Sequence, residues 1–178
     1  MLQHKKEIKM ELTSKEAGKL LKNLNEKILS TLKKEEKSSS FLASVEEDPE
    51  TCRPVYDYEA TREELRVLEE QVRKLRHALN VFNTTHVVPG FDMTIDQMLV
   101  YIPQLTKQKE KLDQMKSVLP RTRVESMYGS TQNFIDYRYV NYDLKTVEED
   151  FEKVSNELSR AQTALDLINS TESFEIAL

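Results

Sequence analysis

Residues 83–93, Asn-Thr-Thr-His-Val-Val-Pro-Gly-Phe-Asp-Met, separate two long segments that have the periodicity of amphipathic helices. A break this short between two long helices usually folds the second helix back along the first. The stretch therefore predicts the tip of an antiparallel helical hairpin. Its β-branched threonines suit a paired extended run, and its apolar side chains would be unfavourable in water. We therefore expect a strand at Phe134–Val140 or a partner subunit to cover it. The candidate contact surface of this tip is made of Thr84, Thr85, His86, Val87, Val88 and Phe91.

The segments on either side of the tip carry clear helix signals. Apolar residues alternately three and four positions apart, a coiled-coil seam, precede it: Leu65, Leu68, Val72, Leu75, Leu79 and Phe82. Asp57 can cap this helix, which we expect over residues 58–82. After the tip, Thr94 and Gln97 fit a capping box, which predicts a helix over residues 95–119.

Two further helices complete the pattern. A Thr-x-x-Glu capping box at Thr13 opens a helix over residues 14–37. Its apolar stripe consists of Ala17, Leu20, Leu21, Leu24, Ile28 and Leu32. The last helix, residues 144–169, has an unbroken seam: Leu144, Val147, Phe151, Val154, Leu158, Ala161, Leu165 and Ile168. Residues 1–37 hold ten Lys against six Glu, and residues 143–178 hold nine acids against three bases. We therefore expect the first and last helices to lie near each other.

Three loops, residues 38–57, 83–93 and 120–142, connect the four helices. We expect the apolar residues of the first loop to lie across the helices, with a mobile linker as the alternative. Residues 1–12 should be frayed, and the alternating Phe174-Glu175-Ile176 should dock as a short strand. The predicted fold is a single all-α domain, residues 1–178. It consists of long antiparallel helices in a hairpin or bundle, with at most a small β element near the tips.

The composition agrees with extended helices. Charged residues make up 32% of the chain, Gly occurs three times and Trp is absent. The net charge of −5 argues against a molecule built as a whole to bind polyanions. Cys52 is the single cysteine, so no disulfide can form within the chain, which suits a reducing cytoplasm. We find no signal peptide and no apolar run near the ~20 residues that span a bilayer, and expect a cytoplasmic protein.

No catalytic constellation emerges from the sequence. His4, His77 and His86 lie far apart in the chain, and no phosphate-binding or metal-binding spacing occurs. We therefore predict no enzyme activity, no cofactor and no metal site. His86 could act as a ligand or a pH-sensitive contact, but a lone histidine lacks the partners of a site. We interpret it as an ordinary polar residue beside two valines.

An Arg/Tyr-rich segment is the best candidate for molecular recognition outside the tip. Its candidate residues are Arg121, Arg123, Tyr137, Arg138 and Tyr139. Arg binds phosphates in a bidentate manner and Tyr offers stacking faces, as in proteins that bind single-stranded nucleic acids. Tyrosines also pack as amphipathic cover over helix ends. We prefer the cover interpretation, because the three Arg are interspersed with acids.

Three passages carry a resemblance to known proteins: HALNVFNTT (77–85) with DMTIDQML (92–99), DYRY (136–139) with NYD (141–143), and AQTALDLIN (161–169). They resemble a group of small, uncharacterised bacterial helical proteins, mostly from Firmicutes. More distantly, the helix order and the closing Leu-Asp and Asn are similar to the septicolysin family. The resemblance covers most of residues 50–178. It implies a helical fold and no active site, so no functional residue is carried over.

The packing signals favour a non-enzymatic helical assembly or protein-interaction protein, which we expect to form a homo-oligomer. An RNA- or DNA-binding helical arm, resting on Arg62–Arg76 and the Arg/Tyr segment, is the alternative. A septicolysin-like pore-forming toxin is a third possibility.

Overall fold

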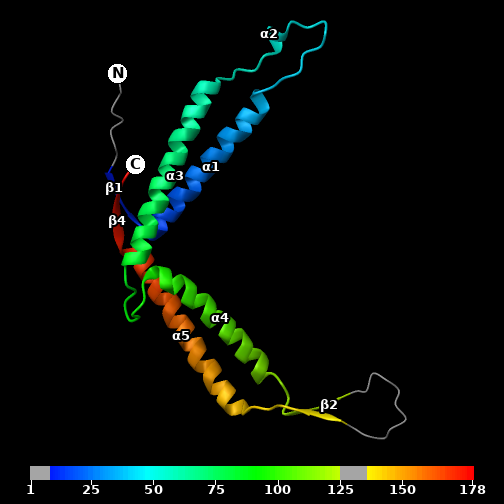
Figure 1. The fold of residues 1–178 in the computed structure, drawn as a ribbon, viewed down its shortest axis with the longest axis vertical. Helices are drawn as coiled ribbons and strands as arrows, with labels where there is room; N and C mark the ends of the chain where they lie inside the picture. The colour runs from blue at the N-terminus through cyan, green and yellow to red at the C-terminus, as the bar shows by residue number, and fades with distance from the viewer. Residues whose placement is uncertain (1–8, 125–135) are drawn as a thin grey trace, which may run out of the picture. The chain divides into compact units, whose positions relative to one another are not determined.

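A computed structural model describes residues 9–124 and 136–178 (Figure 1). Its elements are, in order, β1 (Lys9–Thr13), α1 (Ser14–Ser38), α2 (Pro49–Cys52), α3 (Tyr58–Thr85), α4 (Ile95–Lys116), β2 (Arg121–Arg123), β3 (Tyr137–Tyr139), α5 (Leu144–Thr171) and β4 (Ser173–Ala177). The protein is mostly helical, with short antiparallel strand pairs. The chain divides into two compact units: unit 1 is Met1–His86 with Leu167–Leu178, and unit 2 is Val87–Asp166.

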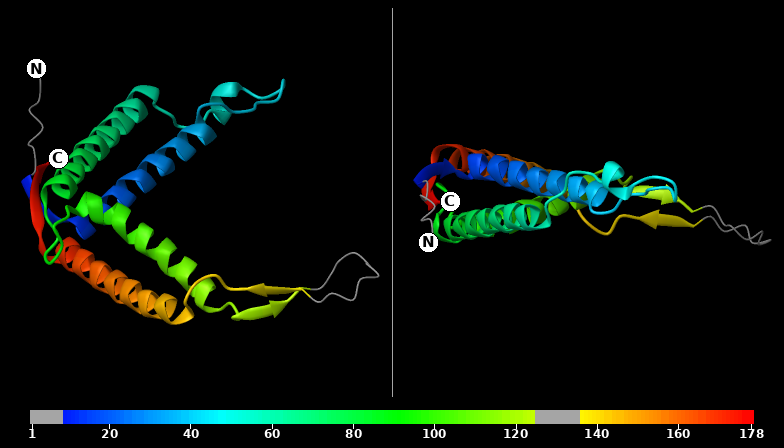
Figure 2. Two further views of the ribbon diagram at one scale, coloured as in Figure 1. Left: turned by 60° about the horizontal axis from the view of Figure 1, so that its bottom comes forward. Right: turned by 90° about the horizontal axis from the view of Figure 1, so that it is seen from above.

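In unit 1, α1 and α3 lie side by side in both views (Figures 1 and 2). Their facing sides form the core, where Leu24 of α1 is buried with Leu68 and Leu75 of α3. Both helix starts are capped as the sequence predicts. Thr13 and Glu16 form the capping box of α1, and the Asp57 carboxylate accepts a hydrogen bond from the backbone of α3.

The buried face of α1 differs from the predicted stripe near its end. Thr31 is buried there and its hydroxyl donates to Glu64 at 3.4 Å, whereas Leu32 is exposed. Positions 17, 24 and 31 are seven residues apart, so they return to the same side of the helix. Leu32 lies one position further round, which is why the prediction that it joins the core is wrong.

A two-stranded sheet completes the core of unit 1. Strands β1 and β4 are antiparallel, with Met10 opposite Ile176 and Leu12 opposite Phe174. These four side chains belong to the core or pack against it. The prediction of a strand at the C-terminal end is confirmed. The prediction that residues 9–12 are frayed is wrong, because the alternating Met10 and Leu12 gain a partner strand from the far end of the chain.

Three of the four apolar residues that we expected to lie across the helices are exposed in the loop between α1 and α3, whereas Phe41 is half-buried. Leu42 is 97% exposed, and Val45 and Val55 are fully exposed. The loop contains one helical turn, α2, which is capped by Asp48. At its end the Tyr56 hydroxyl donates to the Glu35 carboxylate at 2.7 Å, which attaches the loop to the end of α1.

Unit 2 pairs α4 with the part of α5 that precedes Leu167. The Lys116 ammonium lies 3.6 Å from the ring centroid of Phe151, and the Tyr142 hydroxyl donates to the Met115 carbonyl at 2.8 Å. The capping box at Thr94 is confirmed. Helix α4 ends at Lys116, three residues before the predicted end. A residue directly before proline is disfavoured in helical conformation, so the helix stops well ahead of Pro120.

The seam residues of α3 and α5 are all buried or half-buried. Lys109 occupies a seam position in α4, where its ammonium lies 5.7 Å from the Phe151 ring centroid. A lysine is accommodated there because its aliphatic stem packs on apolar surface while its charge reaches the ring face.

The tip of the predicted hairpin lies at the division between the two units. Helix α3 extends to Thr85, and unit 2 begins at Val87. Because α3 and α4 lie in different units, the hairpin between them stays a prediction. The expected approach of the first and last helices stays a prediction for the same reason.

Candidate interaction surfaces

Thr84 and Thr85 of the tip are helical, so the prediction of an extended run is wrong at these two positions. The Thr84 hydroxyl donates to the Asn80 carbonyl at 2.9 Å, and the Thr85 hydroxyl donates to the Val81 carbonyl at 2.7 Å. A hydroxyl that bonds to the preceding turn is one way in which threonine is tolerated in a helix. The helix therefore continues three residues beyond Phe82.

His86 follows directly as the C-cap of α3. Its ring stacks on Phe82 with centroids 3.9 Å apart, and its Nδ1 lies 2.9 Å from the Phe82 carbonyl oxygen. These contacts hold the imidazole against the helix end. They give His86 a structural role, in keeping with the interpretation that it is an ordinary polar residue.

The unit 2 part of the tip forms a tight turn. The Val88 N–H donates to the Met93 carbonyl at 2.8 Å and the Phe91 N–H to the Val88 carbonyl at 3.1 Å. Gly90 has a φ of +79°, which favours glycine at this position. Val88 is completely buried, whereas Val87 is 57% exposed and is bridged to Thr94. Phe91 is half-buried, with the Arg160 guanidinium 5.7 Å from its ring centroid.

Within the described part of the strand expected at Phe134–Val140, residues Tyr137–Tyr139 form β3, which does not pair with the tip. It pairs antiparallel with β2, so that Arg121 lies opposite Tyr139 and Arg123 opposite Tyr137. Residues 134 and 135 lie outside the described part of the chain. The prediction that this strand covers the tip is wrong, because β3 finds its partner within the same loop.

The β2–β3 register places four candidate residues on one face. Residues directly opposite each other share a face, and every second residue of a strand returns to it. Arg121, Arg123, Tyr137 and Tyr139 therefore form one surface, the Arg/Tyr face. The Arg121 guanidinium lies 4.5 Å from the Tyr137 ring centroid, and the two tyrosine rings are 6.5 Å apart.

The exposure of Tyr137 and Tyr139 contradicts the interpretation that they cover helix ends, whereas Tyr142 does contact the end of α4 through its hydrogen bond to the Met115 carbonyl. Tyr137 is 41% exposed and Tyr139 is 65% exposed. Among the described residues, no carboxylate lies within ion-pair distance of Arg121 or Arg123. The Arg/Tyr face thus presents two cations and two aromatic rings to its surroundings.

Arg138 lies on the opposite face of the ribbon. It lines a hollow of about 250 Å³ together with Thr122, Leu119 and Tyr142, and Tyr139 of the Arg/Tyr face also contributes to this lining. The structure thus separates the five predicted residues of this segment, with four on one side and Arg138 on the other.

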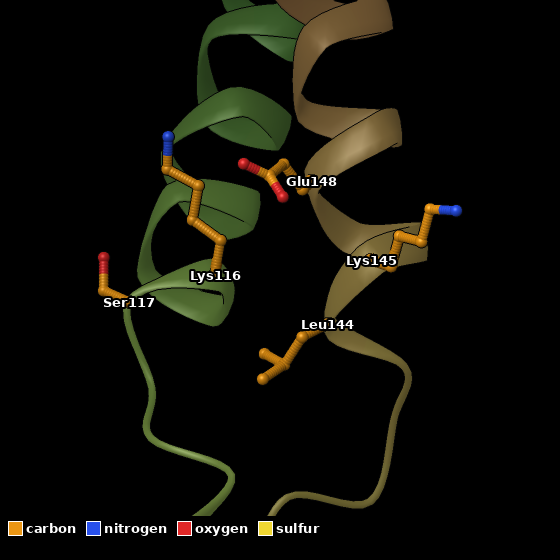
Figure 3. A pocket seen from close by; sticks show the side chains of 5 residues that line it. All are labelled: Lys116, Ser117, Leu144, Lys145 and Glu148. Atoms are coloured by element: carbon orange, nitrogen blue, oxygen red, sulfur yellow. The ribbon is translucent and has the colours of Figure 1, made fainter.

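A second cleft, of about 410 Å³, opens between the end of α4 and the start of α5 (Figure 3). Leu144 and Glu148 point from α5 toward α4, whereas the Lys145 side chain points away. Next to the cleft, Asp143 accepts hydrogen bonds from the Lys145 N–H and the Thr146 hydroxyl, and these lower the pKa of its carboxyl group. The carboxylate oxygens of Asp143 thus accept hydrogen bonds from the first turn of α5.

The cations of α3, which supported a nucleic-acid-binding arm, are partly neutralised by their neighbours. Arg66 pairs with Glu63 at 2.8 Å and with Glu70 at 3.3 Å, and Lys74 pairs with Glu70 at 3.4 Å. The hydrogen bond to Glu63 raises the pKa of the Arg66 guanidinium. These side chains of α3 therefore carry charges of both signs that pair with each other.

The loop after α1 brings a further surface that helical periodicity did not indicate. We call residues 41–50 the acidic loop. A turn between Ser44 and Glu47 holds it, with the Ser44 N–H donating to the Glu47 carboxylate at 3.1 Å. Leu42 and Val45 project fully into solvent just before the acids at 46–48. In the sequence, this surface is indicated only by isolated apolar residues within a polar loop.

Comparison with known proteins reveals a likeness of fold. No family model matches the chain, and no curated protein matches it. A crystal structure of a functionally unknown conserved protein from Corynebacterium diphtheriae is similar, with a TM-score of 0.57 at 14% sequence identity. The match covers 93% of this chain and 99% of that chain.

At that identity the likeness shows the fold alone, so no functional residue is transferred from the neighbour. Among residues 9–124 and 136–178, no group of three His, Cys, Asp or Glu side chains could hold a metal ion. In the same part of the chain, none of the helices is long and apolar enough to cross a membrane.

Proposed function

We propose that this protein is a non-enzymatic helical protein that acts by assembling with copies of itself. The observation that carries the proposal is the pattern of burial along the seams. In α3, Leu68, Leu75 and Phe82 are buried, whereas the seam residues between them are only half-buried: Leu65, Val72 and Leu79. One helix pair thus encloses every second seam position and leaves the others partly open.

The other helices show the same partial enclosure. Ile28 of α1, Ile102 of α4 and Val154 of α5 are half-buried, and Leu29 of α1 is 57% exposed. In a four-helix bundle each seam is covered from two sides, so two helix pairs enclose what one pair leaves open. Coiled-coil packing between helix pairs of two copies would supply that cover.

In such a bundle, charge favours the packing of a basic helix against an acidic one. Helix α1 carries seven Lys and four Glu, and α5 carries six acids and three bases. We propose that unit 1 of one copy packs on unit 2 of another, so that a basic helix approaches an acidic one. Complementary surface charge contributes mainly to the choice of partner and to the association rate.

Light scattering of the full chain tests this proposal. We expect a mass that is a multiple of the chain mass of 20.8 kDa at micromolar concentration. A monomer at every concentration would overturn the proposal. Leu29→Lys should lower the oligomer population, because it replaces an exposed apolar side chain of α1 with a charge. Asn23→Lys adds the same charge at an exposed position of the same helix and should leave the population unchanged.

The other functional hypotheses make different predictions. Binding of RNA or DNA predicts retention on a heparin column that weakens steeply with salt. A septicolysin-like toxin predicts leakage of dye from liposomes. The half-buried seam residues support self-association and are required by neither of these two hypotheses, which is why we prefer self-association.

A further inference from the structure

The Arg/Tyr face is a small exposed surface on which two arginines and two tyrosines lie together. The backbones of Arg121 and Arg123 are held in the strand ladder, and the ladder is extended by backbone hydrogen bonds on both sides. The Val124 N–H donates to the Asp136 carbonyl at 2.9 Å, and the Val140 N–H donates to the Pro120 carbonyl at 3.2 Å. The stacking of Arg121 on Tyr137 further limits the conformational freedom of the Arg121 side chain. Such a surface loses little conformational entropy on binding.

The chemistry of this face specifies the ligand. Guanidinium groups bind carboxylates in a bidentate manner, and exposed tyrosine rings bury apolar side chains while their hydroxyls stay hydrated. The matching ligand is a peptide that combines carboxylates with projecting aliphatic side chains.

The acidic loop of this chain has that combination. Leu42 is 97% exposed and Val45 is fully exposed, and Glu46, Glu47 and Asp48 follow directly. Glu47 and Asp48 already accept hydrogen bonds within the loop. Among the described residues, Glu46 has no hydrogen-bond or ion-pair partner. The loop is also ordered by its Ser44–Glu47 turn, so its apolar and acidic side chains are presented together.

We propose that the Arg/Tyr face of one copy binds the acidic loop of a second copy. Arg123 would pair with Glu46, and the tyrosine rings would cover Leu42 and Val45. Charge complementarity carries the assignment, since within residues 9–124 and 136–178 the two arginines of the face and Glu46 of the loop have no ion-pair partner, and Glu46 lies beside exposed aliphatic residues. The inference rests on the proposed self-association and specifies one contact within it. In a two-fold symmetric dimer this contact occurs twice.

A pair of charge reversals tests the contact. Arg123→Glu and Glu46→Arg should each weaken self-association about tenfold or more, measured as the dimer dissociation constant by sedimentation velocity. Mixing the two variants in equal amounts should restore a heterodimer with near wild-type affinity. In that heterodimer one contact joins the introduced glutamate of the first variant to the introduced arginine of the second. The other contact is the natural pair of Arg123 and Glu46.

Two further variants serve as controls for this experiment. Arg138→Glu makes the same charge change on the opposite face of the ribbon and should leave association unchanged. Leu42→Ser alters a side chain that is almost fully exposed, so we expect it to weaken association without changing the thermal melt of the dilute protein.

Each result decides between the hypotheses. A wild-type protein that remains monomeric would overturn the proposed self-association together with this contact. An oligomer that both reversals leave intact would overturn only the contact. Weakening by both reversals without rescue in the mixture would show that the two surfaces do not meet. If Arg123→Glu instead abolishes binding of a fluorescent single-stranded oligonucleotide and leaves the mass unchanged, the face binds nucleic acid and the proposal is wrong.

Discussion

Val87 and Val88 form a matched pair for testing the structure of the tip. The two valines are adjacent, but Val88 is completely buried and Val87 is 57% exposed. Replacing Val88 with Ser removes two buried methyl groups, worth about 1.6 kcal/mol, and leaves a hydroxyl without a partner, which costs about 1–3 kcal/mol. We therefore expect Val88→Ser to lower the free energy of unfolding by about 2.6–4.6 kcal/mol. At Val87 the same substitution should change it by less than about 0.5 kcal/mol.

Urea unfolding followed by circular dichroism at low protein concentration measures both effects. Val88→Ala is a useful intermediate, since it removes the methyl groups without adding a hydroxyl and should cost about half as much as Val88→Ser. If the tip is also a contact surface, Val87→Ser lowers the oligomer population while the dilute protein remains as stable as the wild type. Equal losses of stability at the two positions would refute the turn geometry on which this reasoning depends.

Three further predictions follow from the packing and capping of the helices. Leu75→Ala should lower the free energy of unfolding by about 2–5 kcal/mol, whereas Leu29→Ala should cost under about 1 kcal/mol in dilute protein; urea unfolding that ranks them in reverse would contradict the observed core. Thr13→Ala should lower the free energy of unfolding by about 0.5–2 kcal/mol through loss of the α1 cap. Thr163→Ala, at an exposed mid-helix position, should be nearly neutral, and thermal melts of the two variants measure both effects. Hydrogen bonds from the Thr13 N–H and hydroxyl lower the pKa of the Glu16 carboxyl group from its ordinary value of 4.5. A carboxyl group with a depressed folded pKa contributes stability above its ordinary value and loses it as the pH falls through the folded value, so Glu16→Gln should flatten the pH dependence of the melting temperature below pH 4.5.

The helices could be predicted from local patterns because their signals are local. Seam spacing and capping residues place α3 and α5 within a few residues of their observed ends. The end of α4 was placed too late, because the apolar stripe continues to Leu119 although the helix stops at Lys116. Thr31 was missed as a buried residue because its polarity hides its place in the seven-residue repeat.

The strands and the pairing of the Arg/Tyr segment required contacts that no local pattern contains. Strand β1 pairs with the other end of the chain, and without that partner the short alternation of Lys9, Met10, Glu11 and Leu12 does not establish a strand. The sequence indicated a strand near Tyr137 but favoured the β-branched tip as its partner. The actual partner, Arg121–Arg123, has little strand propensity. Only the register shows that Arg121, Arg123, Tyr137 and Tyr139 share one face.

Sedimentation equilibrium of the full chain across the micromolar range is the most direct test of the proposed assembly. We expect a species whose mass is a multiple of 20.8 kDa and which dissociates on dilution and on addition of salt, because complementary charges select the partner. A single species of 20.8 kDa at every concentration and at low salt would contradict the proposal that this protein functions by assembling with itself.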